Sequence, residues 1–394
     1  MVNFASQVND ERIKILDVRC QTSDFRFQTN SLESKYVHRK SCNYQPATHN
    51  SKPLSFSNPK TLPPKKTLSP KQNPYLCSMK SLKVVFLGTP EFAKTSLEAI
   101  HQSNHEVVGV VTVADKASGR GQKISQSPVK VYASEHHIPV FQPEKLRNPE
   151  FLESLRQLNA DVFVVVAFRM MPKVLFEMPA MGTFNLHASL LPDYRGAAPI
   201  NYAVINGEEK TGATTFFINE KIDEGNILLQ EEIPVLENEN AGSLHDRLME
   251  MGSKLVVKTL DGLAENSIIE KPQPHVEHPK NAYKIFKEDT KINWNAPSKT
   301  VHQFILGMSP YPAAFTTLRI GEEEKGLKIF SGKFELSHHG KPVGSSDISK
   351  NDFKIYTQDG FYYPLELQLE GKKRMNIKDF LNGFRNFDEI GLGV

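Results

Sequence analysis

A series of short apolar runs, alternating with segments of helical periodicity, constrains the fold of this chain most strongly. The runs are dominated by Val, Leu, Ile and Phe, which is typical of strands buried on both faces of a sheet. Strands are predicted at residues 82–87, 107–113, 161–168, 183–189, 213–218 and 226–233, and helices at residues 92–100, 127–136, 148–158 and 243–265. This alternation predicts an α/β domain with a mainly parallel sheet covered by helices on both faces.

The pattern changes toward the C-terminus. Short segments of alternating polarity, separated by Gly and Pro turns, predict a small β-barrel. These segments are residues 314–320, 328–335, 353–357 and 362–369. Pro272, Pro274 and Pro279 mark a linker before them. We therefore predict an N-terminal extension, an α/β domain, a linker and a barrel, at residues 1–80, 81–270, 271–289 and 290–394 respectively.

The first eighty residues differ from the rest in charge and composition. They contain 13 Lys or Arg against 5 Asp or Glu, whereas the remaining residues contain 35 against 40. They are rich in Ser, Asn, Gln, Pro and Lys and show no sustained period, so we expect disorder. The segment is expected to be an extension upstream of a true start at Met79, an organellar transit peptide, or a basic RNA-binding arm.

Composition also argues against several classes of protein. No apolar run approaches the length needed to span a bilayer, and no secretory signal peptide opens the chain. All three cysteines, Cys20, Cys42 and Cys77, lie in the extension, which leaves no disulfide framework and no CxxC pair. The histidines show no ligand spacing, so we expect no metal.

The run GTFNLHASLLPDYRG at residues 182–196 is the best candidate for a functional site. Asn185 and His187 are two apart in a predicted strand, so their side chains project from the same face. A turn-prone loop follows and ends at Arg195. Polar groups at the end of a strand in an open α/β sheet occupy the position where such sheets bind ligands.

Together with three further motifs, this run resembles the formyltransferase family that uses 10-formyltetrahydrofolate. The other motifs are FLGTPEFA at residues 86–93, ASGRGQK at 117–123 and IDEG at 222–225. The resemblance implies a Rossmann-like catalytic domain followed by an OB-like barrel. It is nearest to the branch that formylates methionine attached to initiator tRNA. One alternative is transfer to a small amine, such as a nucleotide-linked amino sugar or glycinamide ribonucleotide. The others are hydrolysis of 10-formyltetrahydrofolate, with water as the acceptor, and non-catalytic binding of tRNA or folate.

The resemblance also implies roles for individual residues. Asn185 would donate to the oxyanion, His187 would handle protons, and Asp223 would orient the histidine. The folate co-substrate would contact a four-residue loop consisting of Ser189, Leu190, Leu191 and Pro192. The family commonly has Ala-Tyr-Gly where this chain has Ala167-Phe168-Arg169, which changes the expected recess for the pterin ring.

Contacts with tRNA are expected from the glycine-flanked loop that carries Arg120 and Lys123, from Arg195, and from the barrel. The barrel is only weakly basic, with 14 Lys or Arg and 12 Asp or Glu in residues 290–394. Charge alone would therefore not predict RNA binding. We expect a cytoplasmic monomer, or a protein of an organelle matrix if the extension is a transit peptide.

Overall fold

The computed structural model describes residues 80–118 and 123–393. The predictions made for residues 1–79 and for Arg120 therefore lie outside the described residues. Within the described part of the chain, no helix is long and apolar enough to cross a membrane.

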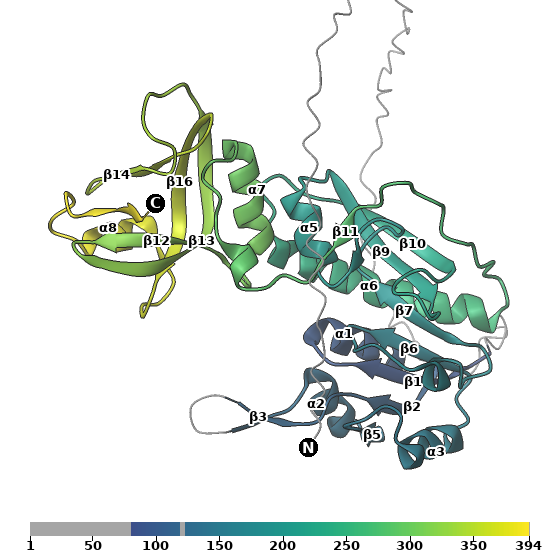
Figure 1. Cartoon of the computed structure of the whole chain (residues 1–394). Helices are drawn as coiled ribbons and strands as arrows, with labels where there is room; N and C mark the ends of the chain where they lie inside the picture. Colours follow the sequence, from purple (N-terminus) through teal and green to yellow (C-terminus); the bar gives the residue numbers. More distant parts are fainter. Residues whose placement is uncertain (1–79, 119–122, 394) are drawn as a thin grey trace, which may run out of the picture. The chain divides into compact units, whose positions relative to one another are not determined.

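A seven-stranded sheet forms the centre of the first domain (Figure 1). Its strands lie in the order β10 (Ile227–Pro234), β9 (Lys210–Phe217), β7 (Thr183–His187), β6 (Val162–Val166), β1 (Lys83–Gly88), β2 (Glu106–Val111) and β5 (Val140–Phe141). The pairings from β7 to β5 are parallel, whereas β9 and β10 are antiparallel to their neighbours. The prediction of a mainly parallel sheet is confirmed.

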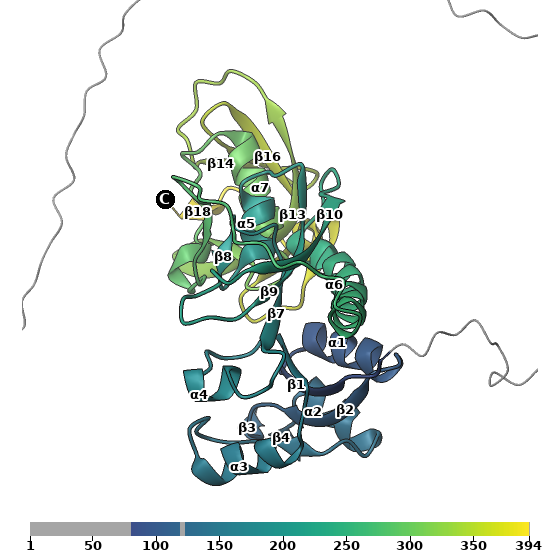
Figure 2. The same ribbon diagram turned by 90° about the vertical axis from the view of Figure 1, so that its right-hand side faces the viewer.

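Helices cover both faces of this sheet, as the apolar runs require. They are α1 (Glu91–His101), α2 (Pro128–Glu135), α3 (Pro149–Gln157), α4 (Lys173–Phe176), α5 (Pro199–Ile205) and α6 (Ala241–Ala264). Val84 and Phe86 of β1 pack in the core beneath α1 and α6, while Val85 and Leu87 pack against α3 and α4. Figure 2 shows α1 and α6 on one side of the sheet and α3 and α4 on the other. Alternate residues of one strand thus supply both cores.

The strand order reverses at β1, which pairs with β2 on one side and with β6 on the other. The carboxyl ends of parallel strands meet at one edge, and the reversal opens a crevice there. The loops that follow β1, β6 and β7 therefore converge at the same edge. An additional hairpin, β3 (Lys116–Ser118) and β4 (Lys123–Ser125), follows β2.

The second domain is a nearly closed antiparallel barrel (Figure 1). Its strands lie in the order β14 (Ser346–Ile348), β15 (Phe353–Tyr356), β16 (Gly360–Leu369), β13 (Glu323–Leu336), β12 (Ala314–Ile320) and β18 (Ile390–Gly393), and β17 (Met375–Asn376) pairs with β16. The amide of Leu392 donates to Ser346 Oγ at 3.2 Å, which links the two outer strands. Leu318, Leu327 and Tyr362 are fully buried in its core.

The expectation of an all-β second domain is incomplete. The structure adds a 3-10 turn, η1 (Glu288–Thr290), and the helices α7 (Ser298–Met308) and α8 (Ile377–Asn382). Val301 and Ile305 of α7 are buried in the barrel core, four residues apart on one helical face. The sequence therefore contains apolar residues at helical spacing here, but the neighbouring segments of alternating polarity favoured an interpretation as strands.

His302 on α7 makes the stability of the fold depend on pH. Its ring is buried, Nε2–H donates to Asn238 Oδ1 at 2.9 Å, and burial lowers the pKa of His302 below its ordinary value of 6.5. Protons then bind the unfolded chain more readily than the folded one. The contribution of neutral His302 to stability is therefore complete above pH 6.5 and is lost as pH falls below it.

The free energy of urea-induced unfolding should decrease by up to about 1.4 kcal/mol per pH unit from this residue alone. A His302→Gln variant should lose less stability between about pH 8 and about pH 5.5; an equal loss would contradict this assignment.

Candidate active site at the carboxyl edge of the parallel sheet

A cavity of about 1310 Å³ lies where the carboxyl ends of the parallel strands meet. Pro90 borders it after β1, Ala167 after β6, and Asn185 and His187 at the end of β7. Asp223 borders it from the turn between β9 and β10. The structure thus brings together the three residues that the sequence analysis placed in a catalytic trio.

Asn185 and His187 project into the cavity from the same face of β7. Asn185 pairs in register with Val165 of β6 and with Phe216 of β9, so sheet pairing on both sides fixes its backbone. Among the described residues, none hydrogen-bonds the side-chain amide of Asn185. Its Nδ2 donors are therefore available to a bound molecule.

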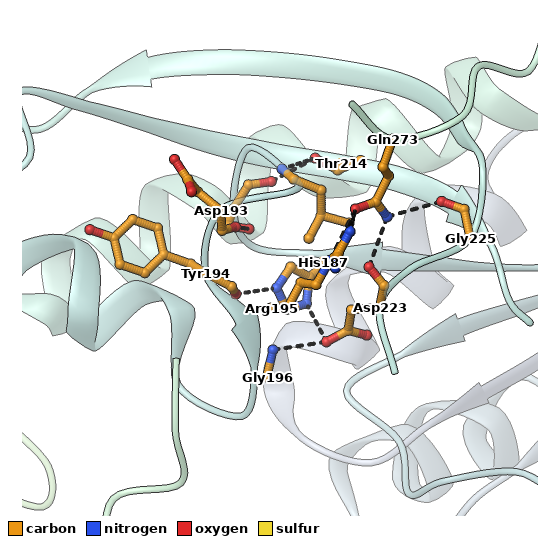
Figure 3. A network of polar contacts seen from close by, with 11 residues as sticks. His187, Asp193, Tyr194, Arg195, Gly196, Thr214, Asp223, Gly225 and Gln273 are labelled. Carbon is orange, nitrogen blue, oxygen red and sulfur yellow. Dashed lines mark hydrogen bonds and ion pairs between the residues drawn. The ribbon is translucent and has the colours of Figure 1, made fainter. Parts of the chain in front are cut away.

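The imidazole of His187 is held by a backbone carbonyl. Nε2 lies 2.8 Å from the carbonyl oxygen of Tyr194 (Figure 3). A carbonyl only accepts hydrogen bonds, so Nε2 carries the proton and the neutral ring has its lone pair at Nδ1. Nδ1 in turn lies 3.8 Å from Asp223 Oδ2, and the ring is only 7% exposed. A proton taken up at Nδ1 would therefore face a carboxylate.

The Asp223 side chain is fixed from a second loop. Its Oδ2 accepts a hydrogen bond from the amide of Gly196 at 2.9 Å (Figure 3). The backbone of Asp223 is in the left-handed region, at φ +54. Ala167 and Tyr194, which also adjoin the site, have φ +46 and φ +61. Sparsely populated conformations of this kind cluster at functional sites, where the surrounding structure imposes them.

The predicted folate loop lies behind the cavity wall. Ser189, Leu190, Leu191 and Pro192 are absent from the residues that line it. Ser189 is fully buried and its hydroxyl donates to the Asp193 carbonyl, while Thr214 of β9 contacts both Ser189 O and Leu191 N. These contacts hold the backbone of the loop behind His187. Contact of this loop with the folate stays a prediction.

The basic residues that we expect to contact tRNA lie in different parts of the fold. Arg195 lies in the cavity wall, where its guanidinium is bonded to Gln273 and Glu224. Lys123 begins β4 of the hairpin, whereas Arg120 lies outside the described residues. Arg169, the departure from the family pattern, donates to the carbonyls of Pro143 and Glu144.

Gln273 and the carbonyl of Tyr194 make contacts in the site that the sequence does not predict. Gln273 lies in the linker, where no periodicity or motif distinguishes it. Tyr194 acts through its main chain, so its side-chain identity carries no signal. Only the folded structure places these groups beside His187 and Asp223 (Figure 3).

Gly225 allows the close packing of the turn between β9 and β10. A Cβ added there would lie 1.6 Å from the carbonyl oxygen of Phe217. Gly225→Ala should therefore destabilise the protein by about 1–3 kcal/mol through overpacking, and should also reduce activity by displacing Asp223. Urea unfolding measures the first effect. Gly340→Ala is the matched control, because a Cβ there would meet nothing within 4 Å. Wild-type stability and activity in Gly225→Ala would contradict the close approach.

Comparison with known proteins decides the family. The model of the formyl transferase family matches residues 82–260, and that of the formyl transferase C-terminal domain matches residues 284–385. The chain belongs to the formyl transferase family. Family members of known name include the methionyl-tRNA formyltransferase of Flavobacterium johnsoniae, 49% identical over 311 residues that cover 79% of this chain and 99% of that protein. The Bacteroides fragilis enzyme of the same name is 47% identical, covering 77% of this chain and 95% of that protein.

Two solved structures share the fold at lower identity. A sugar 3N-formyl transferase, determined in the presence of dTDP and 5-N-formyl-THF, has a TM-score of 0.54 and 22% identity, and the match covers 74% of this chain and 99% of that one. HypX from Aquifex aeolicus in complex with tetrahydrofolic acid has a TM-score of 0.52 and 16% identity, covering 76% and 47% of the two chains. At these identities the likeness shows the fold alone.

Proposed function

We propose that this enzyme transfers the formyl group of 10-formyltetrahydrofolate to the amino group of methionine on initiator tRNA. The observation that carries the proposal is the convergence of Asn185, His187 and Asp223 on one cavity. Relatives named methionyl-tRNA formyltransferase, 45–49% identical over most of the chain, support this choice of acceptor.

The cavity suits a folate co-substrate. Beside Asn185 its wall includes the apolar side chains of Val165, Phe168, Phe176 and Ile218. A flat pterin ring can pack against such a wall, while the neighbouring backbone groups satisfy its polar edge. We propose that this wall, formed by residues from the end of β6 to α4 and by the residue after β9, receives the pterin.

The geometry then assigns the chemical steps. The methionine amine attacks the formyl carbon, and the Asn185 amide donates to the oxyanion that develops. His187 Nδ1 accepts the proton that the amine loses, while Nε2–H remains bonded to the Tyr194 carbonyl. The imidazolium that forms faces Asp223 at 3.8 Å. As the tetrahedral intermediate collapses, the same proton passes to N10 of the departing tetrahydrofolate, so the enzyme is regenerated.

The remaining parts are proposed to hold the tRNA. Lys123 is the first residue of β4 in the β3–β4 hairpin, and Arg120 precedes it in the sequence; we propose that both contact the acceptor arm. The barrel would bind more distant phosphates. Such contacts release counterions, so affinity for tRNA should fall steeply with salt. We further propose that the enzyme acts as a cytoplasmic monomer.

A panel of acceptors tests the proposed function. The purified full chain is expected to transfer formyl groups to methionyl-initiator tRNA, and to do so far more slowly to free methionine, glycinamide ribonucleotide or nucleotide-linked amino sugars. The reason is that only the charged tRNA engages the barrel together with the cavity. Product formation is followed by mass spectrometry. Faster transfer to one of the small amines would contradict the proposed acceptor while leaving the catalytic trio in place.

A further inference from the structure

The linker between the two domains directly contacts the turn between β9 and β10, which carries Asp223. Gln273 Nε2 donates to the carbonyl of Asp223 at 2.7 Å and to that of Gly225 at 2.9 Å. Its Oε1 accepts from Arg195, at 3.1 Å from Nε and at 2.6 Å from an Nη atom. One half-buried side chain therefore joins the turn between β9 and β10 to the segment that follows β7 (Figure 3).

The same linker also holds the carboxylate of Asp223. Its strand β11 (Asn281–Ala282) pairs in parallel with β8 (Arg195–Gly196). Gly196, at φ +120, approaches the linker so closely that a Cβ would lie 2.4 Å from Ala282 O. This pairing places the Gly196 amide that donates to Asp223 Oδ2. Asp223 is thus restrained at its main chain by Gln273 and at its side chain through β8.

A third contact of the linker reaches the support of His187. The amide of Tyr194 donates to the Lys280 carbonyl at 2.5 Å, and Lys280 Nζ lies 2.5 Å from Glu208 Oε1. Glu208 also accepts a hydrogen bond from the Tyr194 hydroxyl. The residue whose carbonyl fixes the His187 tautomer is therefore bound to the linker at both its main chain and its side chain.

We propose that the linker segment from Gln273 to Ala282 is part of the catalytic machinery, with Gln273 as the positioning residue for Asp223. The left-handed conformation of Asp223 is sparsely populated and is kept where other contacts impose it. The two hydrogen bonds from Gln273 Nε2 are such contacts. Because the barrel follows this linker in the chain, the segment that connects the domains would also position a residue of the active site.

Glutamine is suited to this position because it both donates and accepts. Gln273→Glu keeps the shape and the oxygen that faces Arg195, but removes both donors and sets a carboxylate against two carbonyl oxygens. Gln273→Met keeps approximate length without charge, and so provides a second variant should the glutamate disturb folding. Gln157→Glu, on the exposed end of α3, is the matched control.

The test combines kinetics with a double-mutant cycle, and it rests on the proposed function. In the full chain, Gln273→Glu and Gln273→Met are expected to lower kcat by about 10- to 100-fold with KM for both substrates nearly unchanged. In an Asp223→Ala background the same replacements should cost less than about twofold, because Gln273 acts through Asp223. Gln157→Glu should leave both constants at their wild-type values.

The free enzyme gives a readout that does not depend on turnover. Both Gln273 variants should move the ring-nitrogen NMR signals of His187, which faces Asp223, whereas Gln157→Glu should not. Equal losses of kcat in the two backgrounds, or unchanged His187 signals in stably folded Gln273 variants, would overturn the inference. A wild-type chain that transfers no formyl group would instead refute the proposed function, and the His187 signals would still decide the role of Gln273.

Discussion

Replacing His187 with alanine is expected to lower kcat by about 10²- to 10⁴-fold, the usual contribution of a positioned general acid–base. The imidazole lies beside a carboxylate and has its tautomer fixed by the Tyr194 carbonyl. Without it, the attacking amine must lose its proton to water. KM for the folate should stay within about threefold, because the ring is not part of the apolar wall that we propose for the pterin.

Steady-state kinetics with charged initiator tRNA measures this effect. His136→Ala is the matched control, since that histidine is exposed at the end of α2, away from the cavity lining. Circular dichroism and urea unfolding would show that the variant remains folded. Loss of the folded state, or wild-type kcat in a folded His187→Ala protein, would mean that the residue serves packing and not proton transfer.

Replacing Asn185 with alanine is expected to reduce kcat by about 10²- to 10³-fold, which is typical when one oxyanion donor is removed. No described residue competes for its amide, so the full donor capacity faces the cavity. Asn185→Asp should be at least as damaging, because it keeps the shape but places negative charge where the oxyanion develops.

The kinetic pattern distinguishes the proposed role of Asn185 from simple substrate binding. An interaction made only in the transition state lowers kcat and kcat/KM together, whereas uniform binding raises KM alone. Single-turnover rates with saturating folate would separate the two. An Asn185→Ala enzyme with normal kcat and a raised KM would contradict the oxyanion role and assign the amide to ground-state binding.

The sequence predicted the sheet and half of the site for simple reasons. Strands buried on both faces give apolar runs that are hard to mistake, and the period of two in residues 183–187 places Asn185 and His187 side by side. The role of Asp223 came only with the family resemblance, because 36 residues separate it from His187 in the sequence. No local pattern reports a distance of that kind.

The parts that sequence reasoning missed depend on tertiary contacts. The sequence does not show that Thr214 of the neighbouring strand bonds the backbone of the loop at residues 189–192. Nor does it show that Gln273 from the distant linker accepts hydrogen bonds from Arg195. In both cases the partner lies on an element whose position only the fold determines.

The fate of the formyl group tests the central claim most directly. In a single turnover, the full chain would be mixed with methionyl-initiator tRNA and 10-formyltetrahydrofolate bearing an isotope-labelled formyl group, and the products would be separated. Our account predicts that the label appears on the methionine amine, and that His187→Ala and Asn185→Ala slow its appearance. Release of the label as formate at the same rate with or without charged tRNA would contradict the account, because it would identify water as the acceptor.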